Sequence, residues 1–316
     1  MTPFSSKAFR RVSILAVVMV YLLTIMGGLV RTTGSGLGCP DWPLCYGHLI
    51  PPPDIHAIIE YSHRAVAFFA SLSLIALTVM AFMRHRRDLR IAGPTALMAG
   101  LLVIQVPLGG VVVASELTPY LVAMHLGLAI LILGCVVDVA VAAHSPARSD
   151  GAVGPSRPRL VRTLIPITLV GLFLLVLAGA LVVGSDATFA CPGWPLCSGT
   201  SGLLPSGSDS QLQAIQLLHR YLVGVVSILV IALIAAIMRG NDRGLRRWAW
   251  WLGGLFVGQI LVGALQVWTL FPTALRVLHL AMAAAVWSSL VALAAYAALN
   301  PASERVVGEP IIQSAK

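Results

Sequence analysis

Four histidines of this chain lie inside long apolar segments, where an ionisable side chain is costly unless it has a partner. They form two pairs, one in each half of the chain: His63 with His125, and His219 with His279. Each is expected roughly five to eight residues past the start of its helix, at a depth of about 8–12 Å for a rise of 1.5 Å per residue. The pattern therefore predicts a single layer of four imidazoles.

Such a layer favours haem binding. Two imidazoles on facing helices of a four-helix bundle are a typical pair of axial ligands for haem iron. A hydrogen bond between helices would explain any one of these histidines, but four at one depth favour two bis-histidine haem sites. The chain has no Cys-x-x-Cys-His motif, so a haem would not be attached through it. Zinc is disfavoured because each half offers only two such histidines.

Glu60 precedes His63 by three residues, so the two side chains project from the same face of the helix, one turn apart. The equivalent residue in the second half is Gln216. A carboxylate near a membrane interface is often merely solvated. The difference between the halves nevertheless indicates that the first site performs chemistry, with Glu60 acting as a base or stabilising a developing cation, while the second site only holds a cofactor.

An arginine directly follows one histidine of each pair: Arg64 follows His63, and Arg220 follows His219. Two interpretations are open. The first is a cation near a helix end whose charged head reaches the membrane interface. The second is a partner for the propionate groups of a haem, which need positive charge at that level.

A loop with the sequence Cys-Pro-x-Trp-Pro-Leu-Cys precedes each His-Arg pair, over Cys39–Cys45 and again over Cys191–Cys197. Its two prolines exclude a helix, so the two thiols of each loop can fold back on each other. In an oxidising compartment each pair is expected to form a disulfide. Two roles are open, a staple that shapes a lid over the site below and a redox-active bridge. The fifth cysteine, Cys135, is expected to be a packing residue.

The elements that must position these residues are transmembrane helices. The 316 residues are 58% hydrophobic and 10% charged, with a mean hydropathy of +0.90, and the apolar residues form blocks long enough to cross a bilayer. The net charge of +9 does not indicate nucleic-acid binding, because the basic residues form short clusters between these blocks. Eight helices are expected, over residues 12–30, 59–83, 93–113, 120–143, 162–184, 214–238, 249–270 and 274–299.

The basic clusters also orient the helices. Arginines are concentrated after the second, fourth and sixth helices, whereas loop 31–58 has only Arg31 and loop 185–213 has no Lys or Arg. Both termini are therefore expected in the cytoplasm, and both cysteine loops on the outer face of a cell membrane. The first helix is expected to be retained, because no cleavage site of small residues follows it.

The two halves repeat one another in direct order. The cysteine pairs recur at an offset of 152 residues, His63 at 156, and Gln105, Gly109 and His125 at 154. We expect an all-α polytopic membrane protein in which two four-helix bundles are related by a pseudo-twofold axis along the membrane normal. The expected divisions are the first half over residues 1–144, a cytoplasmic linker over 145–160, the second half over 161–300 and a cytoplasmic tail over 301–316.

Together these features resemble the haem A synthase family over nearly the whole chain. They are the eight helices in two repeats, the four histidines, the Glu60-x-x-His63-Arg64 motif and the paired outer cysteines. The resemblance implies an oxidoreductase that converts the C8 methyl group of haem O to a formyl group by successive hydroxylations, giving haem A for cytochrome oxidase. It further implies that His63 and His125 hold the substrate haem O, that His219 and His279 hold a haem b cofactor, and that Glu60 is catalytic.

The resemblance also implies partners: the farnesyltransferase that makes haem O, the assembly of cytochrome oxidase, and an electron acceptor that the sequence does not identify. A homo-oligomer is compatible with it. Two other classes of function are open from the residues alone. A dihaem b-type electron carrier would use the same histidines, but it would give Glu60 no role. A transporter or haem-handling protein would explain the repeat, but few broken helices or buried charges mark a substrate path.

Overall fold

Eight long helices make up most of the computed structural model, which describes residues 6–145, 157–197, 203–205 and 207–300. Each is long and apolar enough to cross a membrane, so the chain is a multi-pass membrane protein. The predicted helices are confirmed, with bounds that differ by six residues or fewer. They are α1 (Ser6–Thr32), α2 (Ile55–Arg84), α3 (Leu89–Ala114), α4 (Pro119–His144), α5 (Arg159–Gly184), α6 (Ser210–Met238), α7 (Arg243–Trp268) and α8 (Thr273–Leu299).

Local chemistry explains why several helices start earlier than their apolar blocks. Asp54, Asp88 and Asp242 precede α2, α3 and α7, and each side chain accepts a hydrogen bond from a backbone N–H of the first turn. Such a cap satisfies a donor that has no partner within the helix. The polar first turns are thus helical, although hydropathy alone places them outside the spans.

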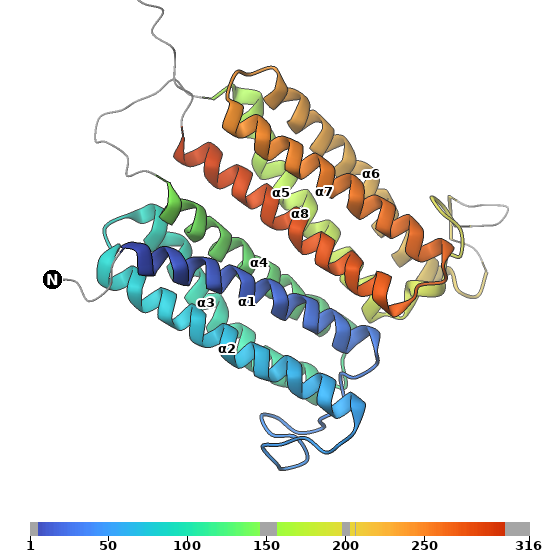
Figure 1. The fold of residues 1–316 in the computed structure, drawn as a ribbon. Helices are drawn as coiled ribbons and strands as arrows, with labels where there is room; N and C mark the ends of the chain where they lie inside the picture. The colour runs from blue at the N-terminus through green and yellow to red at the C-terminus, as the bar shows by residue number, and fades with distance from the viewer. Residues whose placement is uncertain (1–5, 146–156, 198–202, 206, 301–316) are drawn as a thin grey trace, which may run out of the picture.

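The helices form two groups that lie side by side, α1–α4 and α5–α8 (Figure 1). In both groups the first helix packs on the second and the third on the fourth. Contact between the groups is made by α1, α4, α5 and α8, which share one apolar core. The pseudo-twofold relation between the halves stays a prediction, as does the division at residues 144 and 161. Residues 146–156 of the expected linker and the tail 301–316 lie outside the described residues.

Close packing holds α1 against α8. Gly28 is buried, and a Cβ added there would lie 2.6 Å from Cδ2 of Leu280. About two turns earlier on α1, the Tyr21 hydroxyl donates to the carbonyl oxygen of Ala281, which directly follows Leu280, at 2.9 Å. At the loop end of α1, Arg31 donates to the carbonyl oxygen of Val183 at 2.9 Å and pairs with Asp186 at 3.4 Å. The two halves are therefore joined by both apolar and polar contacts.

Both cysteine loops lie at one end of the helices. The start of α1 and the end of α8 lie at the opposite end (Figure 1). This placement follows from four antiparallel helices in each half. The cytoplasmic side of the termini stays a prediction, because no membrane is present to set the sides.

Replacing Gly28 with leucine is expected to destabilise the contact between the halves. The new side chain would enter space held by Leu280, and such overpacking typically costs about 1–3 kcal/mol. Thermal unfolding of the detergent-solubilised protein measures the change. Gly100→Leu is the matched control, because nothing lies within 4 Å of a Cβ added there. Equal unfolding midpoints for the two variants would contradict the assigned packing.

Candidate functional site

The four histidines lie near the loop ends of α2, α4, α6 and α8, six to nine residues after the first residue of each helix. Within each half the two imidazoles lie near enough to influence each other electrostatically, His63 with His125 and His219 with His279. The structure therefore brings the residues of each predicted pair together from the second and fourth helices of their half.

Each imidazole packs edge-on against a glycine of the preceding helix. A Cβ added to Gly27, Gly109, Gly179 or Gly263 would lie 3.3, 3.2, 3.1 or 3.0 Å from Cε1 of His63, His125, His219 or His279, respectively. These distances are tighter than ordinary van der Waals contacts, so a larger residue would have to displace the ring. The same arrangement occurs four times, so it is common to both halves.

Each imidazole has a ring nitrogen that is not hydrogen-bonded to any described residue. Nδ1 of all four rings is buried and has no hydrogen-bond partner in the described part of the chain. On the other side of the ring, Nε2 of His125 lies 3.3 Å from Nε2 of Gln105, and His279 has the same relation to Gln259. A buried polar atom without a partner is costly, so the site is suited to a group that supplies one.

A pair of imidazoles fits a haem better than it fits a bare metal ion. Among the described residues, no group of three or more His, Cys, Asp or Glu side chains is placed to hold a metal. A porphyrin supplies four nitrogen ligands itself and requires only one or two from the protein. The paired, glycine-backed rings therefore match the donor set that a bis-histidine haem needs.

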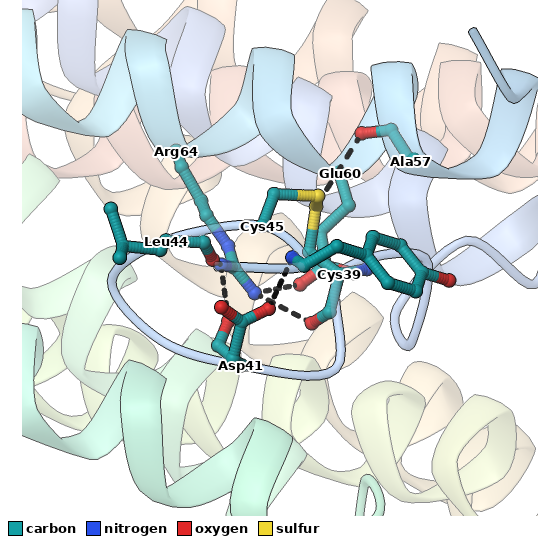
Figure 2. A network of polar contacts seen from close by, with 8 residues as sticks. Cys39, Asp41, Leu44, Cys45, Ala57, Glu60 and Arg64 are labelled. Atoms are coloured by element: carbon teal, nitrogen blue, oxygen red, sulfur yellow. Dashed lines mark hydrogen bonds and ion pairs between the residues drawn. A yellow bond between two sulfur atoms is a disulfide. The ribbon is translucent and has the colours of Figure 1, made fainter. Parts of the chain in front are cut away.

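Glu60 lies at the centre of a polar network under the first cysteine loop (Figure 2). Its residue is 3% exposed, and its carboxylate accepts from the backbone N–H of Cys39 at 2.8 Å and from Arg64 at 2.5 Å. The sequence placed Glu60 on the face of His63. The structure shows in addition that this carboxylate ties the helix to the loop.

Arg64 holds the loop through its backbone. The guanidinium donates to the carbonyl oxygens of Asp41 at 2.6 Å, Leu44 at 2.5 Å and Cys39 at 3.0 Å (Figure 2). Arg64 is therefore not a simple solvated cation at a helix end. The propionate role predicted for Arg64 and Arg220 stays a prediction, and any such contact would be made by a group that already holds a loop.

The second half repeats this arrangement without the carboxylate. Arg220 donates to the carbonyl oxygens of Gly193 at 2.6 Å, Pro195 at 3.2 Å and Cys191 at 3.0 Å. Gln216 is buried like Glu60, but it donates to the carbonyl oxygen of Thr188 at 2.9 Å. One half thus has an ion pair in the network, whereas the other has an amide.

Both predicted disulfides are present, Cys39–Cys45 and Cys191–Cys197, with Cα atoms 4.7 and 4.6 Å apart. All four cysteines are buried, which favours a structural role over a bridge that exchanges with other thiols. Cys135 of α4 packs against the apolar core and is the free cysteine of the described residues.

Asp41 closes the tip of the first loop. Hydrogen bonds from the backbone N–H groups of Gly47 and then Tyr46 hold the pKa of its carboxyl group below the ordinary value of 3.8. Because the folded pKa is lowered, the ionised carboxylate stabilises the loop above the unfolded pKa, and this contribution is lost as the pH falls through the lowered value. The loop is therefore held in its full network at neutral pH.

Sequence reasoning missed two kinds of contributor. Gly27 and Gly179 contact histidines, and their separation of 152 residues equals that of the cysteines, so the repeat could have identified them. The carbonyl acceptors of Arg64 and Arg220 have no such signal, because every residue type presents a backbone carbonyl.

Comparison with known proteins gives a consistent result. A family model named COX15-CtaA and described as cytochrome oxidase assembly protein matches residues 10–291. A haem A synthase of Alkalihalophilus pseudofirmus is 30% identical over 294 residues, 90% of this chain and 95% of that protein. Haem A synthases of Exiguobacterium sibiricum and Staphylococcus aureus are 33% and 30% identical, over 69% and 84% of this chain and 72% and 88% of their own lengths.

Replacing Arg64 with alanine is expected to loosen the first loop. Hydrogen bonds from a charged donor contribute about 1.5–3 kcal/mol each, so losing several should make the Cys39–Cys45 disulfide about tenfold or more easier to reduce. Timed reduction, alkylation and mass spectrometry of the peptides measure the rate.

The reciprocal variant is the control: Arg220→Ala should affect Cys191–Cys197 and leave the first loop unchanged. If Arg64→Ala leaves the reduction rate of Cys39–Cys45 unaltered, the arginine does not hold the loop.

Proposed function

Because the chain belongs to the COX15-CtaA family, with haem A synthases among its relatives, we propose that it converts haem O to haem A. In this reaction the C8 methyl group of the porphyrin becomes a formyl group through successive hydroxylations. The conversion of a methyl to a formyl group with oxygen from water releases four electrons and four protons, which pass to an external acceptor. The chain is accordingly an oxidoreductase.

The observation that carries the proposal is the pairing of imidazoles in both halves, each ring backed by a glycine and each with a buried nitrogen that lacks a partner. This donor set suits two haems. A haem-modifying enzyme that also holds a haem cofactor needs two such sites, and they must be in one protein.

We assign the first half to the substrate, with His63 and His125 as the ligands of the haem O iron. Glu60 supports this assignment because it is one helical turn from His63 and has no acidic counterpart in the second half. With haem O bound, the Glu60 carboxylate would stabilise positive charge that develops at the methyl carbon and would accept the proton of an attacking water. Its contact with Arg64 holds the carboxylate in place for either task.

The second half holds haem b between His219 and His279 in this proposal. When bound, the haem b supplies one-electron redox chemistry. The surrounding residues support a purely binding role, because Gln216 replaces the carboxylate and is already engaged with the carbonyl oxygen of Thr188. Gly179 and Gly263 hold the two rings in the orientation that their first-half counterparts share.

The protein acts in the cell membrane, with the cysteine loops on the outer face. The support is the distribution of charge, because loop 185–213 has no Lys or Arg and loop 31–58 has only Arg31. Its functional partners are the farnesyltransferase that makes haem O and the assembly of cytochrome oxidase, and a homo-oligomer is compatible with the fold.

The alternative drawn from the sequence, a dihaem b-type electron carrier, is not favoured. Relatives that match most of the chain are haem A synthases, and an electron carrier would give Glu60 no task.

Replacing Glu60 with glutamine is expected to abolish conversion while haem binding persists. Loss of a general base or of charge stabilisation typically lowers the rate by about 100-fold or more, so haem O should accumulate and haem A should disappear. Chromatography of haem extracted from the purified protein identifies the types present. Glu116→Gln, a substitution of an exposed carboxylate between α3 and α4, is the matched control. Normal haem A production by Glu60→Gln would refute the catalytic assignment.

Replacing His219 with alanine is expected to remove the resident b-type absorption spectrum, because the haem b loses an axial ligand. Optical spectra of the oxidised and reduced protein test this directly. The matched variant His63→Ala should keep the b-type spectrum and fail to retain haem O. A b-type spectrum that survives in His219→Ala would show that the cofactor is not bound where we place it.

A further inference from the structure

An apolar pocket of 350 Å³ lies between the first cysteine loop and the loop end of α3. Pro40 and Trp42 line it from the loop, and Pro107, Gly110, Val111 and Ala114 line it from α3. Its volume is within the range of about 300–1,000 Å³ that small-molecule sites occupy. No charged side chain lines it, so its ligand must be apolar.

The pocket adjoins the first histidine pair. Gly109 and Gly110 are consecutive on α3; the first faces the ring of His125, and the second faces Trp42, whose Cδ2 would lie 3.2 Å from an added Cβ. About 100° of rotation around α3 therefore separates the side that faces His125 from the side that faces the pocket. A group attached to the edge of a porphyrin bound at His125 would have the pocket next to it on the same helix.

The contact that α3 makes with α2 is the least extensive helix contact in this half. Among the neighbouring pairs of the first half, α2 and α3 pack less closely than α1 with α2 or α3 with α4. Trp42 and Val111 are about half exposed, at 48% and 49%, so the pocket opens to the outside of the bundle. A long substituent can therefore lie along α3 and leave through this side.

The second half has larger residues at the equivalent positions. At the offset of 154 residues, Gly110, Val111 and Ala114 correspond to Ala264, Leu265 and Trp268. The Trp268 ring packs edge-on against Trp194, the counterpart of Trp42, with ring centroids 5.5 Å apart. The space next to the loop tryptophan is thus taken by a side chain in the second half and left open in the first.

We propose that this pocket binds the isoprenoid chain of haem O and so selects haem O over haem b at the first site. The inference rests on the proposed function, in which the first half takes the substrate and the second half a haem b. Haem O differs from haem b by its hydroxyethylfarnesyl substituent, which is apolar. Burying several of its methylene groups against Trp42 and α3 supplies the preference. In the second half, the Trp268 side chain occupies the equivalent space and excludes the isoprenoid chain.

The acyl chain of a membrane lipid has the same apolar chemistry, so the test must separate the two sources. The holoprotein, loaded with haem b in the second half, is titrated with haem O or with haem b, and binding to the first half is followed optically. The wild-type protein should prefer haem O. Ala114→Trp, which introduces the second-half residue, should weaken haem O binding about tenfold or more and change haem b binding by less than about twofold.

Gly110→Ala is the milder variant, because its Cβ presses on Trp42 without filling the pocket, and it should give a smaller loss with the same selectivity. Val103→Trp on the exposed side of α3 is the matched control and should leave both affinities unchanged. The resident haem b spectrum reports that each variant is folded.

Equal weakening of both haems, or no weakening of haem O, would overturn the proposal and leave the pocket to lipid. Failure of the wild-type first half to bind any haem would instead contradict the proposed function. The two failures are therefore distinguishable.

Discussion

A guanidinium group near the loop end of each bundle needs hydrogen-bond acceptors, and the loop above it supplies them. Arg64 and Arg220 each donate to three backbone carbonyls of a cysteine loop. Buried charge is tolerated only when it is paired and hydrogen-bonded, so the arginine and its loop stabilise each other. The disulfide shortens the loop enough for its carbonyls to converge on one cation. The position of each cysteine loop at the end of its bundle follows from this interaction.

The two halves share this scaffold, and their differences are few. The ion pair between Glu60 and Arg64 has no counterpart around Arg220, where Gln216 bonds a carbonyl oxygen instead. The loop tryptophan faces a glycine in the first half and packs on Trp268 in the second. The glycine that packs against each imidazole is shared by both halves. The proposed function assigns a haem to each of these repeated imidazole pairs, and it assigns substrate and cofactor by the differences around them.

The sequence predicted the helices and the histidine pairs because both have periodic or repeated signals. Hydropathy located all eight spans, and offsets near 154 residues matched His125 to His279 and the cysteine loops to each other. It placed the helix starts too late where an aspartate such as Asp54 caps a polar first turn. It did not predict the acceptors of Arg64, because backbone carbonyls have no side-chain signature. The pocket beside Trp42 was also missed, since a cavity results from small residues that look unremarkable one at a time.

The short spacing of Glu60, His63 and Arg64 on α2 has a mechanical consequence. The three side chains belong to neighbouring turns of one helix, and two of them are bonded to the cysteine loop. A small rotation or tilt of α2 would therefore displace the imidazole, the carboxylate and the lid together, as a single rigid body. Neither the lid nor the carboxylate can be repositioned independently of the ligand helix while these bonds persist. Displacing the first cysteine loop therefore means breaking the contacts of both Arg64 and Glu60 with it, or moving the whole helix.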